Sequence, residues 1–467
     1  MSSERLVTSY DSRAVWKICV TASIGSFLFG YNIAVVGQTL DSVASSLKFP
    51  NDGIVSSLLT SVMPLGAAVS APFAGKVSEK IGIRKTLMLF NLINILGAGT
   101  TMVPNIITFV IGRVVTGLSV GIYTALVPIF INESSPTEIS GKTGSLFQIK
   151  TNLGILIAQA LGIFLKDENQ DSTSHEYWWI FMFGLQIVFA FTQFLLLLLI
   201  YRLETPAWYW RKNLTEDALE SLKQVYLKET AQKVLKKLSI EEQDKELTET
   251  FSSEKNYDPS YLDLLLCKQN TSKPMRLGYA NSFFQQFSGI NAINNFFGHI
   301  TGGGLMGAVY TAISGIVSLI ASLASAPLVN SFGRKTLLVS GFAGMGVCQL
   351  VVGLFAGVIS VDYLVKACFL FLFLAFFSLS SGPICWTYCG DILTSRGISI
   401  CSSFNFFCFA VVAFGFYYLK HAIGEEIVFW MLAGICSVAT VYFAVDMVET
   451  KDLSKQEIQE LMLKRGN

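Results

Sequence analysis

The chain has 467 residues and a formal net charge of +1, and 14% of its residues are charged whereas 52% are hydrophobic. Soluble globular proteins carry about 25% charged residues. This composition, with a mean hydropathy of +0.52, therefore excludes an ordinary soluble domain. A charge so close to neutral also gives no support to nucleic-acid binding, and we expect no such partner.

Long runs without charged residues follow one another along the chain. Seven of these runs, each 19 to 26 residues long, cover residues 18–40, 53–75, 177–201, 336–361, 367–390, 397–419 and 427–445. A helix needs about 20 apolar residues to cross the hydrocarbon core of a bilayer. Each run therefore predicts a transmembrane helix, and the lipid bilayer is the expected surrounding of the protein.

Two longer stretches each have room for a pair of spans. Residues 86–132 contain a single charge, Arg113, and the Pro-Asn pair at 104–105 predicts the turn between two helices. Residues 277–333 contain no Asp, Glu, Lys or Arg, and the Thr-Gly-Gly-Gly segment at 301–304 predicts the break. These stretches add four spans to the seven.

The remaining span, residues 144–165, carries Lys150. The sequence therefore predicts an all-α membrane protein of twelve transmembrane helices in two sets of six. A charged segment separates the two sets, and its helical spacing of apolar residues predicts short amphipathic helices on the cytoplasmic side. The expected divisions are an N-terminal half, a linker, a C-terminal half and a tail, at residues 1–203, 204–274, 275–448 and 449–467.

Lysine and arginine in short loops predict the orientation, because cytoplasmic loops carry an excess of both. The loops after the second, eighth and tenth spans contain basic residues, whereas the loop after the first span has one lysine and the loop after the fifth is mainly acidic. The basic residues are Lys76, Lys80, Arg84, Lys85, Arg334, Lys335 and Arg396. Both termini are therefore expected in the cytoplasm.

The two halves also repeat short sequence marks at equivalent points. Gly82-Ile83-Arg84-Lys85-Thr86-Leu87 corresponds to Gly333-Arg334-Lys335-Thr336-Leu337, Glu204-Thr205 to Glu449-Thr450, and Glu133 to Asp391. Three such marks in the same order predict a duplication. Parallel repeats of this kind occur in a large class of secondary transporters that bind substrate between the halves.

The chain shows no pattern of a cofactor, a metal site or an enzyme. Seven of its nine cysteines lie in predicted spans of the second half, and none is in a predicted outer loop, so disulfides are not expected. His175, His299 and His421 are isolated in the sequence, and neither a His-x-x-x-His nor a nucleophile motif occurs. A pore loop or charge ring, which a channel needs, is not evident either.

Several motifs resemble the sugar porter family of the major facilitator superfamily, which includes the facilitative glucose transporters. The resemblance covers nearly the whole chain and is most specific in the seventh and tenth spans. The matching segments are Gly30-Tyr31-Asn32, Arg113 to Gly117, Val127-Pro128 with Glu133 to Pro136, Gln285 to Ala292, Gly382-Pro383 with Trp386, Glu204 to Pro206, and Glu449 to Lys451. The resemblance implies the major facilitator fold and alternating-access transport of a hexose.

Amide side chains in the membrane suit that chemistry, because sugar hydroxyls both donate and accept hydrogen bonds and so do amides. The family resemblance places a sugar site at mid-membrane, formed mainly by the second half, on Gln148, Gln285, Gln286, Asn291, Trp386 and Asn405. Gln286 and Asn291 lie about 140° apart around an ideal helix, so a bent or interrupted helix is needed, and Gly289 allows one. An alternative is that these amides only bridge helices.

Some positions differ from the family pattern. Asn294 and Asn295 follow Asn291 where the family usually has aromatic residues, and Ser318 replaces an asparagine. Together with Asn32 these residues are candidates for the sugar site or an outer gate. Lys150 stands where a small residue is expected, and the simplest interpretation is that its long side chain reaches the cytoplasmic headgroups.

Charges at equivalent points of the repeats predict a cytoplasmic gate. Four acids and three arginines contribute to this gate. When the gate is closed, the ends of the fourth and tenth spans are attracted to the loops after the second and eighth spans. These residues are Glu133, Glu204, Asp391, Glu449, Arg84, Arg334 and Arg396. The alternative is that these charges only set the orientation of the chain in the membrane. That alternative explains the arginines but not the four acids.

No Asp or Glu lies inside a predicted span. In proton-coupled relatives an acid occupies the place of Asn32 and faces the arginine that corresponds to Arg113, so the resemblance implies a facilitative uniporter. Lys150 and, less strongly, His299 are the alternatives for a proton-coupled sugar or polyol symporter. A sugar sensor of the same fold is a further alternative. We expect a multi-pass protein of the cell membrane that acts as a monomer on a small sugar.

Overall fold

The structure is a computed structural model that describes residues 10–48, 53–136, 138–166, 172–239, 261–267, 272–357, 362–451, 453, 457–458 and 461–462. Within these ranges the chain is almost wholly helical, and its β-structure is one isolated bridge between Tyr10 and Tyr226. Residues 240–260 and 268–271 of the expected linker, and most of the expected tail, lie outside the described ranges.

Long helices make up the first half of the chain. The helices are α1 (Ser12–Ala22), α2 (Ile24–Ser46), α3 (Gly53–Ser70), η1 (Ala71–Phe73), α4 (Ala74–Ile81), α5 (Ile83–Thr101), α6 (Ile106–Ser134), α7 (Ser140–Gly144), α8 (Leu146–Gly162), η2 (Ile163–Lys166), α9 (Ser172–Leu195) and the π-helix η3 (Leu196–Ile200). The predicted turn at 104–105 separates α5 from α6. There the Asn105 side chain accepts a hydrogen bond from the Ile107 N–H and caps α6.

Short helices in the linker lead to a second set of long ones. Those in the linker are α10 (Pro206–Arg211), α11 (Thr215–Lys223), a helix over 228–239, and α13 (Tyr261–Leu265). The second set is α14 (Ser272–Phe287), α15 (Ile290–Ile300), α16 (Gly304–Phe332), α17 (Arg334–Gly357), α18 (Tyr363–Leu379), α19 (Ser381–Ile392), α20 (Ser395–Ile423) and α21 (Glu425–Asp446). The break expected at 301–304 separates α15 from α16.

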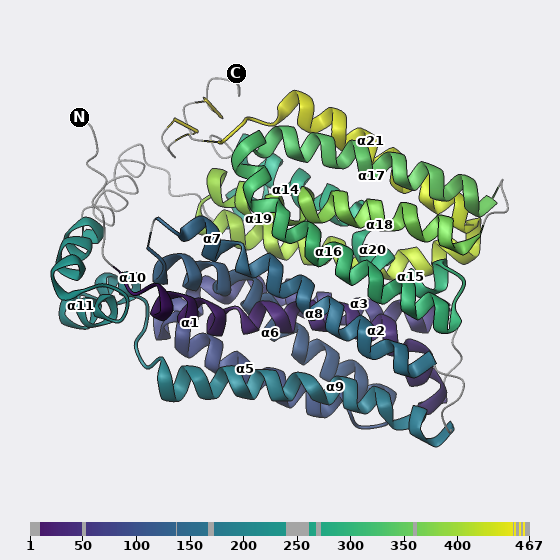
Figure 1. Ribbon diagram of the computed structural model, residues 1–467, viewed down its shortest axis with the longest axis horizontal. Helices are drawn as coiled ribbons and strands as arrows, with labels where there is room; N and C mark the ends of the chain where they lie inside the picture. The colour runs from purple at the N-terminus through teal and green to yellow at the C-terminus, as the bar shows by residue number, and fades with distance from the viewer. Residues whose placement is uncertain are drawn as a thin grey trace.

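Ten helical stretches among the described residues are long and apolar enough to cross a membrane. The two other expected spans are present as α5, which begins with Arg84 and Lys85 near its first turn, and as the interrupted pair α14 and α15. The twelve-span architecture in two sets of six is therefore confirmed. All of these spans run along the long axis of the bundle in Figure 1.

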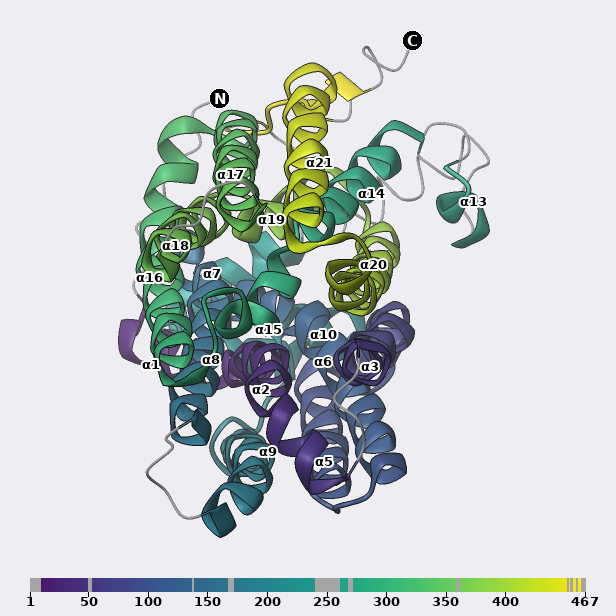
Figure 2. The same cartoon turned by 90° about the vertical axis from the view of Figure 1, so that its right-hand side faces the viewer.

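The two halves lie face to face. Seen end-on in Figure 2, the first-half helices form one side of the molecule and the second-half helices form the other. Two seams join them, α3 against α20 and α8 against α16, and α2 also contacts α15. Helices α10 and α11 lie at the left-hand end of the bundle in Figure 1, where α1 begins and α21 ends, whereas α15 lies toward the opposite end.

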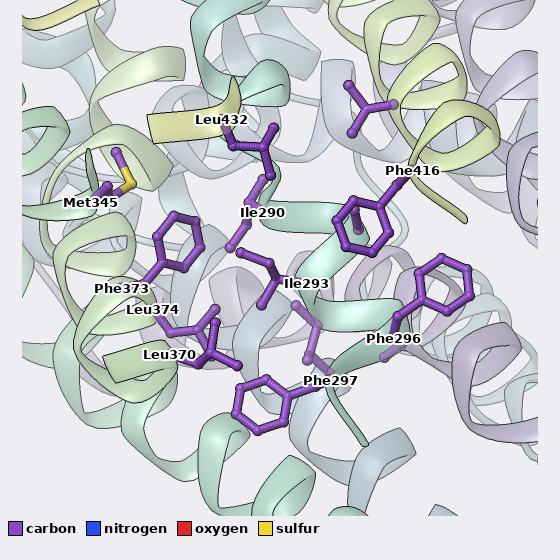
Figure 3. Close-up of a cluster of buried hydrophobic side chains, with 14 of the residues drawn as sticks. Ile290, Ile293, Phe296, Phe297, Met345, Leu370, Phe373, Leu374, Phe416 and Leu432 are labelled. Carbon is purple, nitrogen blue, oxygen red and sulfur yellow. The ribbon is translucent and has the colours of Figure 1, made fainter. Parts of the chain in front are cut away.

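Helix α15 is amphipathic although it lies inside the bundle. Ile290, Ile293 and Phe297 share one face and pack into the apolar core of the second half, among side chains of α17, α18 and α21 (Figure 3). Phe296 stacks on Phe416 of α20, with ring centroids 5.8 Å apart. The amides of α15 occupy the remaining face, because residues three or four apart lie on the same side of a helix.

Candidate functional site

A cavity of about 70 Å³ lies between the two halves. All six residues expected from the sequence to form a sugar site line it, and most of the lining comes from the second half. The polar and aromatic members of the expected set are Gln148 on α8, Gln285 and Gln286 on α14, Asn291 on α15, Trp386 on α19 and Asn405 on α20. The structure therefore brings together residues that are up to 257 positions apart in the sequence.

The amides of the cavity bind one another in a fixed direction. Gln285 Nε2 donates to the main-chain oxygen of Ser381 at 3.1 Å, and Asn405 Nδ2 donates to the main-chain oxygen of Ser282 at 3.3 Å. A carbonyl oxygen can only accept. These two bonds therefore determine which end of each amide carries the nitrogen, and Asn405 Nδ2 also donates to Gln285 Oε1 at 2.8 Å.

The same direction continues across the cavity. Gln286 Nε2 donates to Asn405 Oδ1 at 2.8 Å, and Asn291 Nδ2 donates to Gln286 Oε1 at 2.6 Å. We call these four residues, Gln285, Gln286, Asn291 and Asn405, the amide relay. The relay ends at Asn291 Oδ1, which is left as an acceptor for a hydroxyl group.

A glycine makes the relay possible. Gly289 separates α14 from α15 and has φ 83°, a left-handed conformation that favours glycine. The interruption changes the direction of the chain between Gln286 and Asn291, so that both amides meet. The expectation that a glycine interrupts this span is confirmed. A Cβ at this position would also lie 2.7 Å from Leu432 Cδ1.

The four additional candidates fall in different places. Asn294 and Ser318 line the cavity. Asn295 is buried next to Gly37 of α2, where the two halves touch. Asn32 is not among the lining residues and instead belongs to a buried cluster with Arg113.

Several lining residues were not expected from the sequence. Asn152 lies one turn after Gln148 on α8, receives a hydrogen bond from it at 3.3 Å, and donates to the main-chain oxygen of Ser318 at 3.0 Å. The helical spacing from Gln148 was a signal that could have identified it. The others are mainly apolar, and their residue type is the same in a cavity, a core or a lipid-facing surface: Phe29, Ile33, Thr151, Ile155, Ile290, Phe377, Ser378, Gly382, Phe406 and Phe409.

Arg113 is fully buried and is held by neutral groups. Its Nη1 donates to Asn32 Oδ1 at 2.9 Å and its Nη2 to the main-chain oxygen of Asn32 at 3.0 Å. Asn32 Nδ2 in turn donates to Gln186 Oε1 at 2.8 Å, and the guanidinium lies 5.5 Å from the centroid of the Phe183 ring. Among the described residues no carboxylate pairs with Arg113.

Two carboxylates cap helices at equivalent points of the halves. Glu204 accepts hydrogen bonds from the N–H groups of Arg84 and Lys85 at 2.8 and 2.9 Å, at the start of α5. Glu449 accepts from the N–H groups of Arg334 and Lys335, both at 2.9 Å, at the start of α17. Burial raises the pKa of Glu204, although the N–H groups and charges of Arg84 and Lys85 act to lower it.

Glu133 and Asp391, at the ends of α6 and α19, complete the two clusters. Glu133 pairs with Arg211 at 2.7 Å, and Asp391 Oδ2 lies 3.5 Å from Arg334 Nε and accepts from the Thr450 hydroxyl at 2.8 Å. Glu133 thus contacts helix α10 of the linker, and Asp391 contacts the start of α17 and the segment that follows α21. Arg396 is exposed in the first turn of α20.

A family model described as "Sugar (and other) transporter" matches residues 18–462. The chain belongs to this family. Among its relatives, the facilitated glucose transporter member 2 of solute carrier family 2 from Sus scrofa is 30% identical, over 88% of this chain and 78% of the relative. Plastidic glucose transporter 4 from Arabidopsis thaliana is 28% identical, over 98% of this chain and 82% of the relative.

Solved structures of similar fold include the xylose transporter XylE from E. coli in a partially occluded inward-open conformation. It has a TM-score of 0.81 and 20% identity, over 95% of this chain and 100% of XylE. The proton:xylose symporter XylE bound to 6-bromo-6-deoxy-D-glucose gives the same TM-score and identity, over 97% of this sugar transporter and 100% of XylE. This likeness supports the major facilitator fold.

Proposed function

We propose that this protein carries a hexose of the glucose class across a membrane by alternating access, as a transporter rather than an enzyme. The amide relay is the observation that carries the proposal. Its four side chains line a cavity between two halves that can rock against each other, and amides match the mixed donor and acceptor character of sugar hydroxyls. Relatives named as glucose transporters support the choice of a hexose.

We assign the substrate contacts to the amide relay together with Gln148, Trp386, Asn294 and Ser318. Asn291 Oδ1 accepts from a sugar hydroxyl, and the indole of Trp386 offers an apolar face to the C–H groups of the ring. Binding of sugar replaces relay bonds by bonds to hydroxyls, so the amides keep partners in the empty and the loaded carrier. Such an exchange keeps affinity moderate, which suits a carrier that has to release its substrate.

We further propose that transport is uniport. Buried Arg113 donates to Asn32, and Asn32 donates to Gln186; both are neutral amides that cannot exchange a proton. Lys150 on α8 is not among the lining residues of the cavity. Among the described residues that line the cavity there is no titratable side chain to which proton movement could be coupled.

The end of the bundle that bears α10 and α11 is proposed to be cytoplasmic, with both termini on that side of the cell membrane. Two observations support this assignment: Asp11 N–H donates to the Val225 carbonyl at 2.8 Å, and basic residues begin α5 and α17 at this end. We also propose that the first half ends at residue 203, the linker at 274 and the second half at 448, and that the protein acts as a monomer.

The charge clusters at that end are proposed to act as a cytoplasmic gate. Glu204 and Glu449 hold the starts of α5 and α17, while Glu133 and Asp391 tie the ends of α6 and α19 to the same regions. Arg84, Arg334 and Arg396 supply the positive charges. Individual surface pairs contribute about 0–1 kcal/mol, but a network of them can bias two states that differ by a few kcal/mol.

Uptake of radiolabelled sugars by the purified protein in proteoliposomes tests the proposal. D-glucose, D-fructose, D-xylose and a polyol are compared, with L-glucose and empty liposomes as controls. We expect saturable uptake of D-glucose or another D-hexose that equilibrates and is absent with L-glucose. Saturable uptake restricted to a non-sugar solute, or none of these sugars taken up, would reject the hexose assignment.

A further inference from the structure

Helices α2 and α15 touch at the end of the bundle opposite α10 and α11. Gly37 of α2 meets the backbone of Asn295, and a Cβ on Gly37 would lie 2.7 Å from the Asn295 Cα. One turn further along both helices, His299 Nε2 lies 3.7 Å from Asp41 Oδ2. The two halves are therefore in close contact at this end of the molecule, where α2 lies beside α15 in Figure 2.

A second close contact closes the same region between α8 and α16. A Cβ on Gly315 of α16 would collide with Oε1 of Gln159 on α8. Gln159 lies seven residues after Asn152 and eleven after Gln148, so the three amides lie along one face of α8. On α15, Asn295 lies four residues after Asn291. On both α8 and α15, the face that lines the cavity therefore carries one more amide beyond the cavity, Gln159 and Asn295 respectively.

The two amides at these contacts have no hydrogen-bond partner. Gln159 is 0% exposed and Asn295 2% exposed, and in both side chains the oxygen and the nitrogen are unpaired. An unpaired amide in a buried interface costs free energy, and buried amides are normally bonded. Gln349 behaves in the normal way, because its Nε2 donates to the Ser288 carbonyl at 2.6 Å.

We propose that Gln159 and Asn295 form an outer sugar station, a second binding site that the sugar meets before it reaches the cavity. When the two halves part at this end, Gly37 leaves Asn295 and Gly315 leaves Gln159, and both amides then face the path. Each amide can donate to one hydroxyl and accept from a neighbouring one. The station takes one amide from each half, and this inference rests on the proposed function.

The arrangement also explains why the amides are unpaired in this structure. With the outer end closed, the glycine contacts exclude the sugar and leave both amides without a hydrogen-bond partner. Closing therefore removes the station's ability to bind hydroxyls. A sugar that has passed inward meets the amide relay instead, one turn deeper on α15.

The test is a double-mutant cycle between sugar hydroxyls and the two amides, since such a cycle isolates direct contacts. Unlabelled D-glucose and its 1-, 2-, 3-, 4- and 6-deoxy derivatives are added to the outer or the cytoplasmic side of oriented proteoliposomes. The inhibition of labelled D-glucose transport by each sugar is measured. The variants are Gln159→Met and Asn295→Leu. Gln38→Leu is the matched control, because Gln38 is an amide at the same level of α2 that packs on Gly162 instead.

We expect at least one deoxy sugar to inhibit about fivefold more weakly than D-glucose from the outside of the unmodified carrier. In Gln159→Met or Asn295→Leu that difference falls below twofold, while it persists in Gln38→Leu and for sugars added from the cytoplasmic side. Because a shift between the two states of the carrier affects all the sugars alike, it cannot imitate this selective loss. Both variants lose a buried unpaired amide, so their thermal stability is expected to equal or exceed that of the parent.

Unchanged deoxy-sugar differences in both variants, with normal uptake by the unmodified carrier, would overturn the station alone. Equal loss of the differences on both membrane sides would place the amides' effect in the central cavity and would also overturn it. Absence of sugar uptake by the unmodified protein would reject the proposed function and the station together.

Discussion

Arg113 donates two hydrogen bonds to Asn32, one to the side-chain Oδ1 at 2.9 Å and one to the main-chain oxygen at 3.0 Å. Both residues are fully buried. A buried guanidinium is costly unless hydrogen bonds surround it, and here a neutral amide takes the place that a carboxylate could fill. The pair therefore holds the cation without offering a group that changes its charge during transport.

The first prediction is that a proton gradient does not drive accumulation. Proteoliposomes with an inward proton gradient are expected to fill with sugar only to the outside concentration, because the described residues that line the cavity include no titratable side chain and Arg113 is bound by a neutral amide. The measurement is the ratio of internal to external labelled sugar at steady state. Accumulation that a protonophore abolishes would contradict uniport.

A second prediction concerns Lys150, the intramembrane alternative for proton coupling. Lys150 is two residues from Gln148, about 200° around the helix, and is not among the lining residues. Lys150→Met is therefore expected to leave the KM for sugar within about twofold of the parent value. A tenfold change in KM, or a pH dependence lost in this variant, would place the ammonium group on the transport path.

The third prediction is that Gln286→Ala raises the KM for sugar about tenfold, which corresponds to the loss of one or two good hydrogen bonds. Gln286 links Asn291 to Asn405, so its removal also breaks the amide relay in the middle. The matched control is Gln193→Ala, since Gln193 is a buried amide that binds the carbonyls of Thr21 and Ala22 outside the cavity. Equal uptake kinetics in both variants would remove the relay from the sugar site.

Polar positions of the site could be predicted because an amide inside a long apolar run stands out and has few roles there. Gln285 and Asn291 are of this kind. Apolar lining residues such as Phe29 and Phe406 could not be predicted, since their type is the same whether they face lipid, core or cavity. The direction of the amide relay depends on the Ser381 carbonyl, which only tertiary packing brings to Gln285.

The twelve spans were predictable for a similar reason, as hydrocarbon thickness sets their length. The contacts between halves were not, because they depend on close approach at single glycines. Gly37 is one glycine among 38 in the sequence, and nothing local indicates that it meets Asn295. The cost of the unpaired amide at that contact likewise appears only when both helices are in place.

The last prediction concerns the two capping carboxylates. Glu449 accepts the N–H groups of Arg334 and Lys335 at the start of α17, and an anion at a helix N-terminus contributes about 0.3–1 kcal/mol, or up to about 2 kcal/mol when partly buried. Gly333, with φ 84°, brings the chain close to the carboxylate, as a Cβ there would lie 2.5 Å from Glu449 Oε2. Glu449→Gln keeps the shape of the side chain but removes its charge, so the closed cytoplasmic end should lose stability and the inward-open state should gain population.

The measurement is the labelling rate of a cysteine introduced at the cavity-lining Ser378, in a background without the native cysteines, by a reagent added from the cytoplasmic side. We expect the rate to rise severalfold in Glu449→Gln and, because Glu204 holds α5 in the same way, also in Glu204→Gln. Lys150→Met, which leaves both clusters intact, should not change it, and an unaltered rate in both glutamine variants would mean that the capping carboxylates stabilise the helices without gating the path.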